Sequence, residues 1–173
     1  MQKTLVMTIM GKDRTGLVES LAGLIAEHSG NWLESRMCRL GGEFAGILRA
    51  SVPEDRAQVL IGSLEGLKSQ GLTVTIRRDE PLPFVGPTQT VTLSLVGQDR
   101  PGIIYQISAA LAHQNINVEE LETECSSAPM SGEMIFRAVA KLQIPETCAI
   151  SELRKELEEI GSELMVEISC TGI

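Results

Sequence analysis

A six-residue motif of the form Gly-x-Asp-Arg-x-Gly occurs twice in this chain, at residues 11–16 and again 86 residues later at 97–102. In both copies an apolar run with the two-residue period of a strand precedes the motif, and a run with helical period follows it. An asparagine comes after each helix, at Asn31 and Asn117, which are also 86 residues apart. The chain is therefore predicted to contain two copies of one folding unit.

The remaining elements follow in the same order in both copies. A strand that begins at each asparagine is expected to form a hairpin with a third strand, and a second helix and a last strand follow. In the second copy, Leu121, Thr123 and Cys125 alternate with glutamates, which predicts a strand with one buried face. The expected strands are 5–10, 31–40, 43–52 and 72–76, then 91–96, 117–126, 133–142 and 164–168, with helices near 17–25, 59–67, 103–111 and 150–160.

Two βαββαβ units place the chain in the α+β class. A unit of this order forms the ferredoxin-like split βαβ arrangement, in which a four-stranded antiparallel sheet carries both helices on one face. The segment between the copies contains Pro81, Pro83, Gly86 and Pro87, which continue neither helix nor sheet. We expect a first domain at 1–80, a linker at 81–88 and a second domain at 89–173. The uncovered sheet faces favour association of the two repeats and homo-oligomerisation of the chain.

Acidic residues are concentrated in the second half of the chain. The net charge is −8; residues 1–80 hold ten Lys and Arg against ten Asp and Glu, whereas residues 81–173 hold five against thirteen. Such a surface repels phosphate backbones, so direct nucleic-acid binding is not expected. The acidic helix within 152–163 is either a solvated surface or a contact for a basic partner. The apolar run near the N-terminus is too short for a signal peptide or a membrane span, so no membrane association is expected.

The residues that usually carry metal or nucleophilic chemistry are few and scattered. Cys38, Cys125, Cys148 and Cys170 have no close pairing, and only two histidines accompany them. Zinc sites and disulfide frameworks need partners at short spacings, so we expect free thiols in a reducing cytoplasm, without metal or cofactor. The histidines do not align in the repeat, and no Ser-His-Asp, Cys-His or phosphate-binding Gly-Lys-Ser/Thr pattern is present. These observations indicate a protein that is not an enzyme.

The repeated motif has a structural and a functional interpretation. Asp13 and Asp99 stand three residues before a glycine, a spacing at which a carboxylate can cap the start of a helix. Alternatively, the free N–H groups and the positive dipole end of the helix could receive a carboxylate, while the aspartate pairs with an ammonium group. Gly16 and Gly102 would let such a ligand approach closely because they have no Cβ. These requirements together match an α-amino acid.

The two motifs, each followed by an apolar residue, resemble the signature of ACT domains, and the resemblance covers nearly the whole chain. In amino-acid-binding members of that family, ligand contacts come from this loop and from an Asn or Asp that opens the second strand. The resemblance therefore implies ligand sites at Asp13, Gly16 and Asn31 in the first copy and at Asp99, Gly102 and Asn117 in the second. Ligand-binding members often carry a side chain where this chain has Gly11 and Gly97.

A chain of this length with two such units and no attached enzyme resembles the glycine cleavage system transcriptional repressor family. The resemblance implies a regulator that responds to a small amino acid, with glycine the favoured effector, and that acts on a DNA-binding transcription regulator and not on DNA. The alternative is an amino-acid-binding regulatory subunit of a metabolic enzyme, with a different partner. The second copy is the favoured ligand site, because Pro101 lowers the entropy lost when its turn is ordered.

Overall fold

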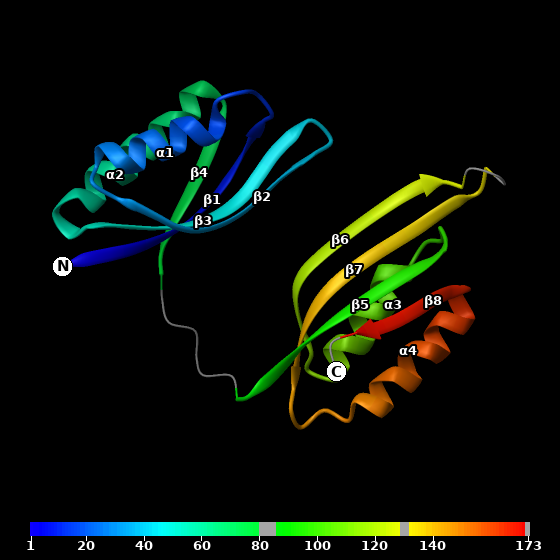
Figure 1. Ribbon diagram of the computed structural model, residues 1–173. Coiled ribbons are helices and arrows are strands. Elements are labelled where there is room, and N and C mark those ends of the chain that lie inside the picture. The colour runs from blue at the N-terminus through cyan, green and yellow to red at the C-terminus, as the bar shows by residue number, and fades with distance from the viewer. Residues whose placement is uncertain (80–85, 129–131, 172–173) are drawn as a thin grey trace. The chain divides into compact units, whose positions relative to one another are not determined.

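The computed structural model describes residues 1–79, 86–128 and 132–171. The chain divides into two compact units, Met1–Leu82 and Pro83–Ile173 (Figure 1). The first contains β1 (Gln2–Lys12), α1 (Leu17–Glu27), β2 (Asn31–Leu40), β3 (Glu43–Pro53), α2 (Glu54–Gly66), the short 3-10 helix η1 (Leu67–Gln70) and β4 (Leu72–Arg78). The second contains β5 (Thr88–Gln98), α3 (Ile103–His113), β6 (Asn117–Ser127), β7 (Met134–Pro145), α4 (Ile150–Leu164) and β8 (Val166–Thr171).

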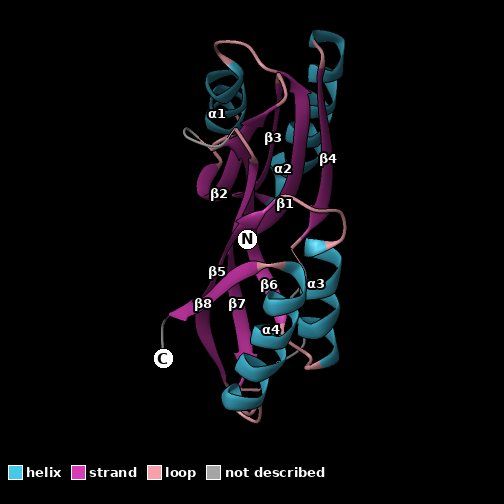
Figure 2. Cartoon of the chain, turned by 90° about the vertical axis from the view of Figure 1, so that its right-hand side faces the viewer, coloured by secondary structure: helices cyan, strands magenta, loops and turns pink. Residues whose placement is uncertain are grey.

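Each unit has the same sheet, with its two α-helices on one face (Figures 1 and 2). The strand order is β2-β3-β1-β4 in the first unit and β6-β7-β5-β8 in the second. Every pairing is antiparallel. The prediction of an α+β fold with two βαββαβ units is confirmed. The predicted linker at 81–88 lies mostly outside the described residues, and Thr88 is the first residue of β5.

The core of each unit lies between its sheet and its helices. Leu5, Met7 and Ile9 of the central strand β1 are at most 1% exposed and belong to the same cluster as Leu21 and Ile25 of α1. The central strand β5 contributes its alternate residues to an equivalent cluster in the second unit. Burial of one such side chain stabilises the fold by about 1.5–3 kcal/mol. Among the described residues no polar side chain is buried.

The backbone keeps the internal repeat in detail. A β-bulge between Trp32 and Glu34 recurs 86 residues later between Val118 and Glu120. The turns that follow α1 and α3 each contain a residue of positive φ, Ser29 at 58° and Asn115 at 56°. In both turns the N–H of this residue and the N–H of the next donate to helix carbonyls, as in a Schellman motif. Most of the extra residues of the second copy lie between β6 and β7, and the others lie between β7 and β8.

Two local expectations were wrong. Strand β6 is not half-buried: it lies at the edge of its sheet, and Leu121 on its helix side is 47% exposed. Leu164 does not belong to the last strand. It is the final residue of α4 and is buried, because Met165 at φ 56° ends the helix and β8 begins only at Val166.

Replacement by alanine is expected to have opposite effects on stability at two glycines of the first unit. A Cβ on Gly11 would collide with the backbone carbonyl oxygen of Gly71 in the neighbouring strand segment, whereas a Cβ on Gly23 in α1 would meet no atom within 4 Å. Gly11→Ala is expected to destabilise the unit by about 1–3 kcal/mol through overpacking. Gly23→Ala is expected to stabilise it by about 1 kcal/mol through helix propensity.

Urea unfolding followed by the fluorescence of Trp32 measures both effects. Trp32 is the sole tryptophan and lies in β2, so the signal reports the first unit alone. Equal effects of the two substitutions would contradict the close approach of β1 to the turn before β4.

Candidate functional site

The loop that joins each central strand to its first helix ends in a left-handed glycine. Gly16 has φ 90° and Gly102 has φ 97°, and each is the N-cap residue of its helix. The first helical hydrogen bonds run from the N–H of Ser20 to the Gly16 carbonyl and from the N–H of Gln106 to the Gly102 carbonyl. The N–H groups of the first turn have no helical partner and form a short array of donors at the loop.

The interpretation of Asp13 and Asp99 as helix caps is wrong. Neither helix has a side-chain cap hydrogen bond, because the glycine and not the aspartate occupies the N-cap position. The aspartates instead lie at the start of the loop, and each is anchored through its backbone to the hairpin beside it. The Asp13 N–H donates to the Gly42 carbonyl at 3.0 Å, and the Asp99 N–H donates to the Met134 carbonyl at 2.9 Å. Both carboxylates are thus left for other contacts.

In the first unit a charged side chain of the chain itself lies at each end of the loop. Arg39 of β2 places its Nε 2.7 Å from the Asp13 carboxylate. Glu19 lies in the first turn of α1, and its Oε2 is 3.8 Å from the position that a Cβ on Gly16 would occupy. The loop therefore has a cation on its aspartate and a carboxylate beside its helix terminus.

In the second unit neither charge is present at the equivalent positions. Residue 125, which corresponds to Arg39 by the 86-residue repeat, is a cysteine, and its thiol lies close enough to Asp99 for the carboxylate to affect its pKa. Desolvation by its neighbours, together with the negative charge of Asp99, raises the pKa of the Cys125 thiol above its ordinary value. The residue that corresponds to Glu19 is Tyr105, which is 77% exposed, and the first turn of α3 contains no acidic residue.

The two asparagines that were assigned to the ligand sites open β2 and β6, at the far end of each sheet from the loops. Asn31 pairs with Ser51, which in turn pairs with Thr4 near the start of β1, whereas the loop follows the end of β1. Helix α1, which separates Gly16 from Asn31, has eleven residues and is about 16 Å long. The second unit has the same register at Asn117. The structure brings together the aspartate and glycine of each loop but not the asparagine of the same unit.

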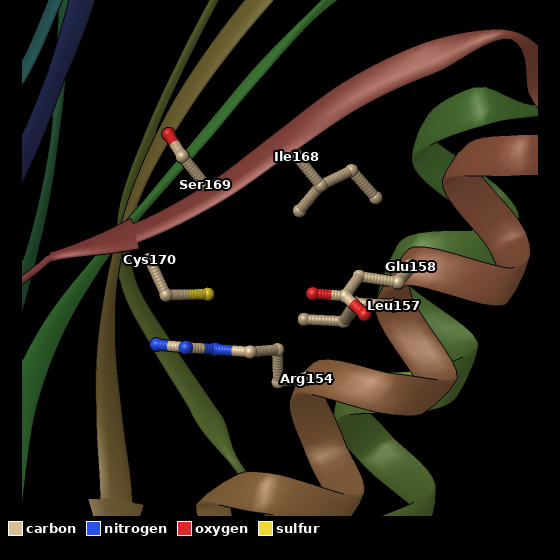
Figure 3. A pocket seen from close by; sticks show the side chains of 6 residues that line it. All are labelled: Arg154, Leu157, Glu158, Ile168, Ser169 and Cys170. Atoms are coloured by element: carbon tan, nitrogen blue, oxygen red, sulfur yellow. The ribbon is translucent and has the colours of Figure 1, made fainter.

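A separate cavity of about 260 Å³ lies between α4 and β8 (Figure 3). The side chains of Arg154 and Glu158 from α4 and of Cys170 from β8 point into it (Figure 3). Partial burial raises the pKa of the Cys170 thiol, a rise that Arg154 opposes and Glu158 reinforces. Cys170 pairs with Leu93, four residues before Gly97, so this cavity is distant from the loop at Asp99.

Within the described ranges there is no group of three or more His, Cys, Asp or Glu side chains that could hold a metal ion. No helix in the described part of the chain is long and apolar enough to cross a membrane.

Comparison with known proteins identifies the two units. Models of the ACT domain match residues 3–77 and 91–147, one in each unit. The chain belongs to the ACT-domain family. The glycine cleavage system transcriptional repressor of Escherichia coli is 26% identical to it over 173 residues, which cover 99% of this chain and 88% of that protein. A UPF0237 protein of Methanopyrus kandleri is 31% identical over 77 residues, 44% of this chain and 79% of its own length.

Solved structures also resemble the whole chain. A protein of unknown function from Galdieria sulphuraria has a TM-score of 0.89 at 29% identity, and the match covers 100% of this chain and 99% of that one. A protein provisionally assigned as a glycine cleavage system transcriptional repressor has a TM-score of 0.71 at 21% identity, covering 100% and 98%, and shares the fold. This tandem ACT protein therefore resembles the repressor family, as the sequence predicted. Its ACT domains and its likeness to that repressor point to a regulatory protein and not to a catalyst.

The contact between Asp99 and Cys125 predicts a measurable effect on thiol reactivity. Only the thiolate reacts with iodoacetamide, so the pH at which alkylation reaches half its maximal rate reports the pKa of the thiol. Asp99→Asn removes the charge that opposes thiolate formation, so it should lower this midpoint for Cys125. Mass spectrometry of the peptide that contains Cys125 measures the rate. Asp13→Asn is the matched control and should leave the profile of Cys125 unchanged; an unchanged midpoint in Asp99→Asn would contradict the contact.

Proposed function

We propose that this protein is a cytoplasmic, amino-acid-responsive regulator, and that the loop of its second unit, Asp99 to Gly102, receives the amino acid. It would act through contact with a DNA-binding transcription regulator that controls the glycine cleavage system. The likeness to the Escherichia coli repressor over 99% of the chain supports the second part of the proposal. The single observation that carries the first part is the difference in charge between the two loops.

The first loop already holds the two charges that a ligand would bring. An α-amino acid has one carboxylate and one ammonium group, and the loop offers helix N–H donors to the first and an aspartate to the second. In the first unit the Glu19 carboxylate and the Arg39 guanidinium lie near these two positions. A ligand there would have to displace an ion pair whose nitrogen and oxygen are 2.7 Å apart. This arrangement favours an internally satisfied loop over a receptor in the first unit.

The second loop has the same backbone and neither of these side chains. Asp99 lies near the Cys125 thiol, and no ion pair of Asp99 with an arginine is found among the described residues, so an ammonium group can pair with it. A Cβ on Gly102 would meet no atom within 4 Å, which leaves room beside the helix terminus. A carboxylate at a helix N-terminus contributes about 0.3–1 kcal/mol, rising to about 2 kcal/mol when partly buried. A hydrogen bond to a charged group adds about 1.5–3 kcal/mol. The upper end of these two terms, about 4–5 kcal/mol in sum, corresponds to a dissociation constant of about 1 mM or slightly below.

Replacement of Cys125, which is exposed, tests the ligand site without removing a side chain from the apolar core. Cys125→Arg should supply the guanidinium that pairs with the aspartate in the first unit, and it should weaken amino-acid binding at least about tenfold, a loss of about 1.4 kcal/mol. Cys125→Ser keeps a small, neutral hydroxyl and should retain binding. Isothermal titration calorimetry of the full chain with glycine and a panel of other amino acids measures both. Absence of heat with every amino acid up to millimolar concentration in folded protein would contradict the sensor proposal, as would equal affinity in the two variants.

The partner can be identified by copurification. The tagged protein should bring down a transcription regulator with a DNA-binding domain, and the protein alone should not retard DNA in a gel at physiological salt because its net charge is −8. Recovery of an abundant metabolic enzyme in place of a regulator would contradict the proposed partner. A gel shift by the protein alone that disappears at high salt would contradict action through another protein.

A further inference from the structure

Each unit exposes the sheet face that lies opposite its helices (Figure 1). Near the middle of this face, Met10 and Ile47 are 55% and 54% exposed in the first unit. The corresponding residues of the second unit, Val96 and Val139, are 43% and 47% exposed. Because paired residues of an antiparallel sheet point to the same side, the strand register identifies the side chains that surround them.

The open face of the first unit is basic. Arg36 pairs with Ile47, and Arg49 and Arg77 both pair with Val6, which points to the same side of β1 as Met10, so all three arginines lie on this face. The carboxylates beside them are Glu34, which lies 3.4 Å from Arg49, and Asp79, which lies 2.7 Å from it. Lys12 and Glu43 lie on the same face and are paired at 2.7 Å. Three guanidinium groups and one ammonium group thus stand against three carboxylates around an apolar centre. We call this surface the basic face.

The same face of the second unit is acidic. Glu122, the repeat equivalent of Arg36, pairs with Val139, and Glu124 and Glu167 pair with Arg137 and Val96. Glu119 and Glu120 both lie 3.8 Å from Lys141, the second of the two cations on this surface. Five carboxylates stand against these two cations around the apolar centre formed by Val96 and Val139. We call this surface the acidic face.

We propose that the basic face of one copy of this protein packs against the acidic face of a second copy. A twofold axis would make the reciprocal contact at the same time, so the dimer closes on itself and uses every open sheet face of both chains. Four strands about 4.8 Å apart and six or seven residues long present about 400 Å² each. Four such faces bury about 1,600 Å², which is the size of an ordinary stable interface. In the dimer the apolar centres pack against each other and exclude water. The opposite charges around them favour contact between a basic face and an acidic face over contact between two like faces.

Salt dependence gives the first test, and it does not depend on whether the protein binds an amino acid. Two chains of net charge −8 repel each other, and salt screens this repulsion. The dissociation constant of a dimer whose interface did not depend on complementary charges would therefore fall as salt rises. Pairing of the basic face with the acidic face should weaken as salt rises. Sedimentation equilibrium of the full chain at micromolar concentrations, at low and high salt, measures the dimer dissociation constant. A chain that remains monomeric throughout, or a dimer that tightens with salt, would overturn the proposal.

Charge reversal on either face gives the second test. Arg36→Glu and Glu122→Arg should each raise the dimer dissociation constant at least about tenfold, because like charges then meet across the contact. Arg56→Glu on α2 and Glu163→Arg on α4 are matched controls, since they change the net charge equally at exposed positions outside both faces. Retention of the native circular dichroism spectrum shows that each variant is folded. Equal weakening by the face variants and their controls would also overturn the proposal.

Discussion

The turn at Gly16 and Gly102 is the constraint on which both units depend. At φ 90° and 97° the backbone leaves the central strand and enters a helix that lies back over the same sheet. Only glycine adopts this conformation without strain, and a side chain there would cost about 1–2 kcal/mol. The turn directs the buried residues of α1 onto the apolar face of β1 and leaves the first N–H groups of the helix beside an aspartate. One backbone conformation thus serves both the packing and the proposed ligand chemistry.

The two units differ in exposed charge far more than in backbone. Arg39 corresponds to Cys125, Glu19 to Tyr105 and Arg36 to Glu122, yet the strand order and the bulge are the same in both units. Ion pairs between exposed side chains contribute little to stability, with a median of about 0–1 kcal/mol. Such positions can therefore change charge without loss of the fold. What changes is the set of molecules that each loop or face attracts.

The order of elements could be predicted because hydrophobic periodicity is local and each pattern occurs twice. Asn31 and Asn117 open the second strands as predicted, but their distance from the loops could not be predicted. The spacing in the sequence does not show that an eleven-residue helix carries the chain to the other end of the sheet. The prediction that Asp13 and Asp99 cap the helices was wrong. The left-handed φ of the glycine three residues later, and not the residue type of the aspartate, determines which residue is the N-cap. The contact of Cys125 with Asp99 was missed, although alignment of Cys125 with Arg39 through the repeat was available as a signal.

Strand β6 is exposed along nearly all of its length and has a neighbour on one side only. A free strand edge is a template for the addition of another strand, and from there for aggregation. Here the edge carries Glu119, Glu120, Glu122 and Glu124, so a second copy of the same segment laid beside it would be repelled. The protection depends on ionised carboxylates. In acid strong enough to protonate these carboxylates, copies of the chain should aggregate by strand pairing at this edge while their apolar cores are still intact.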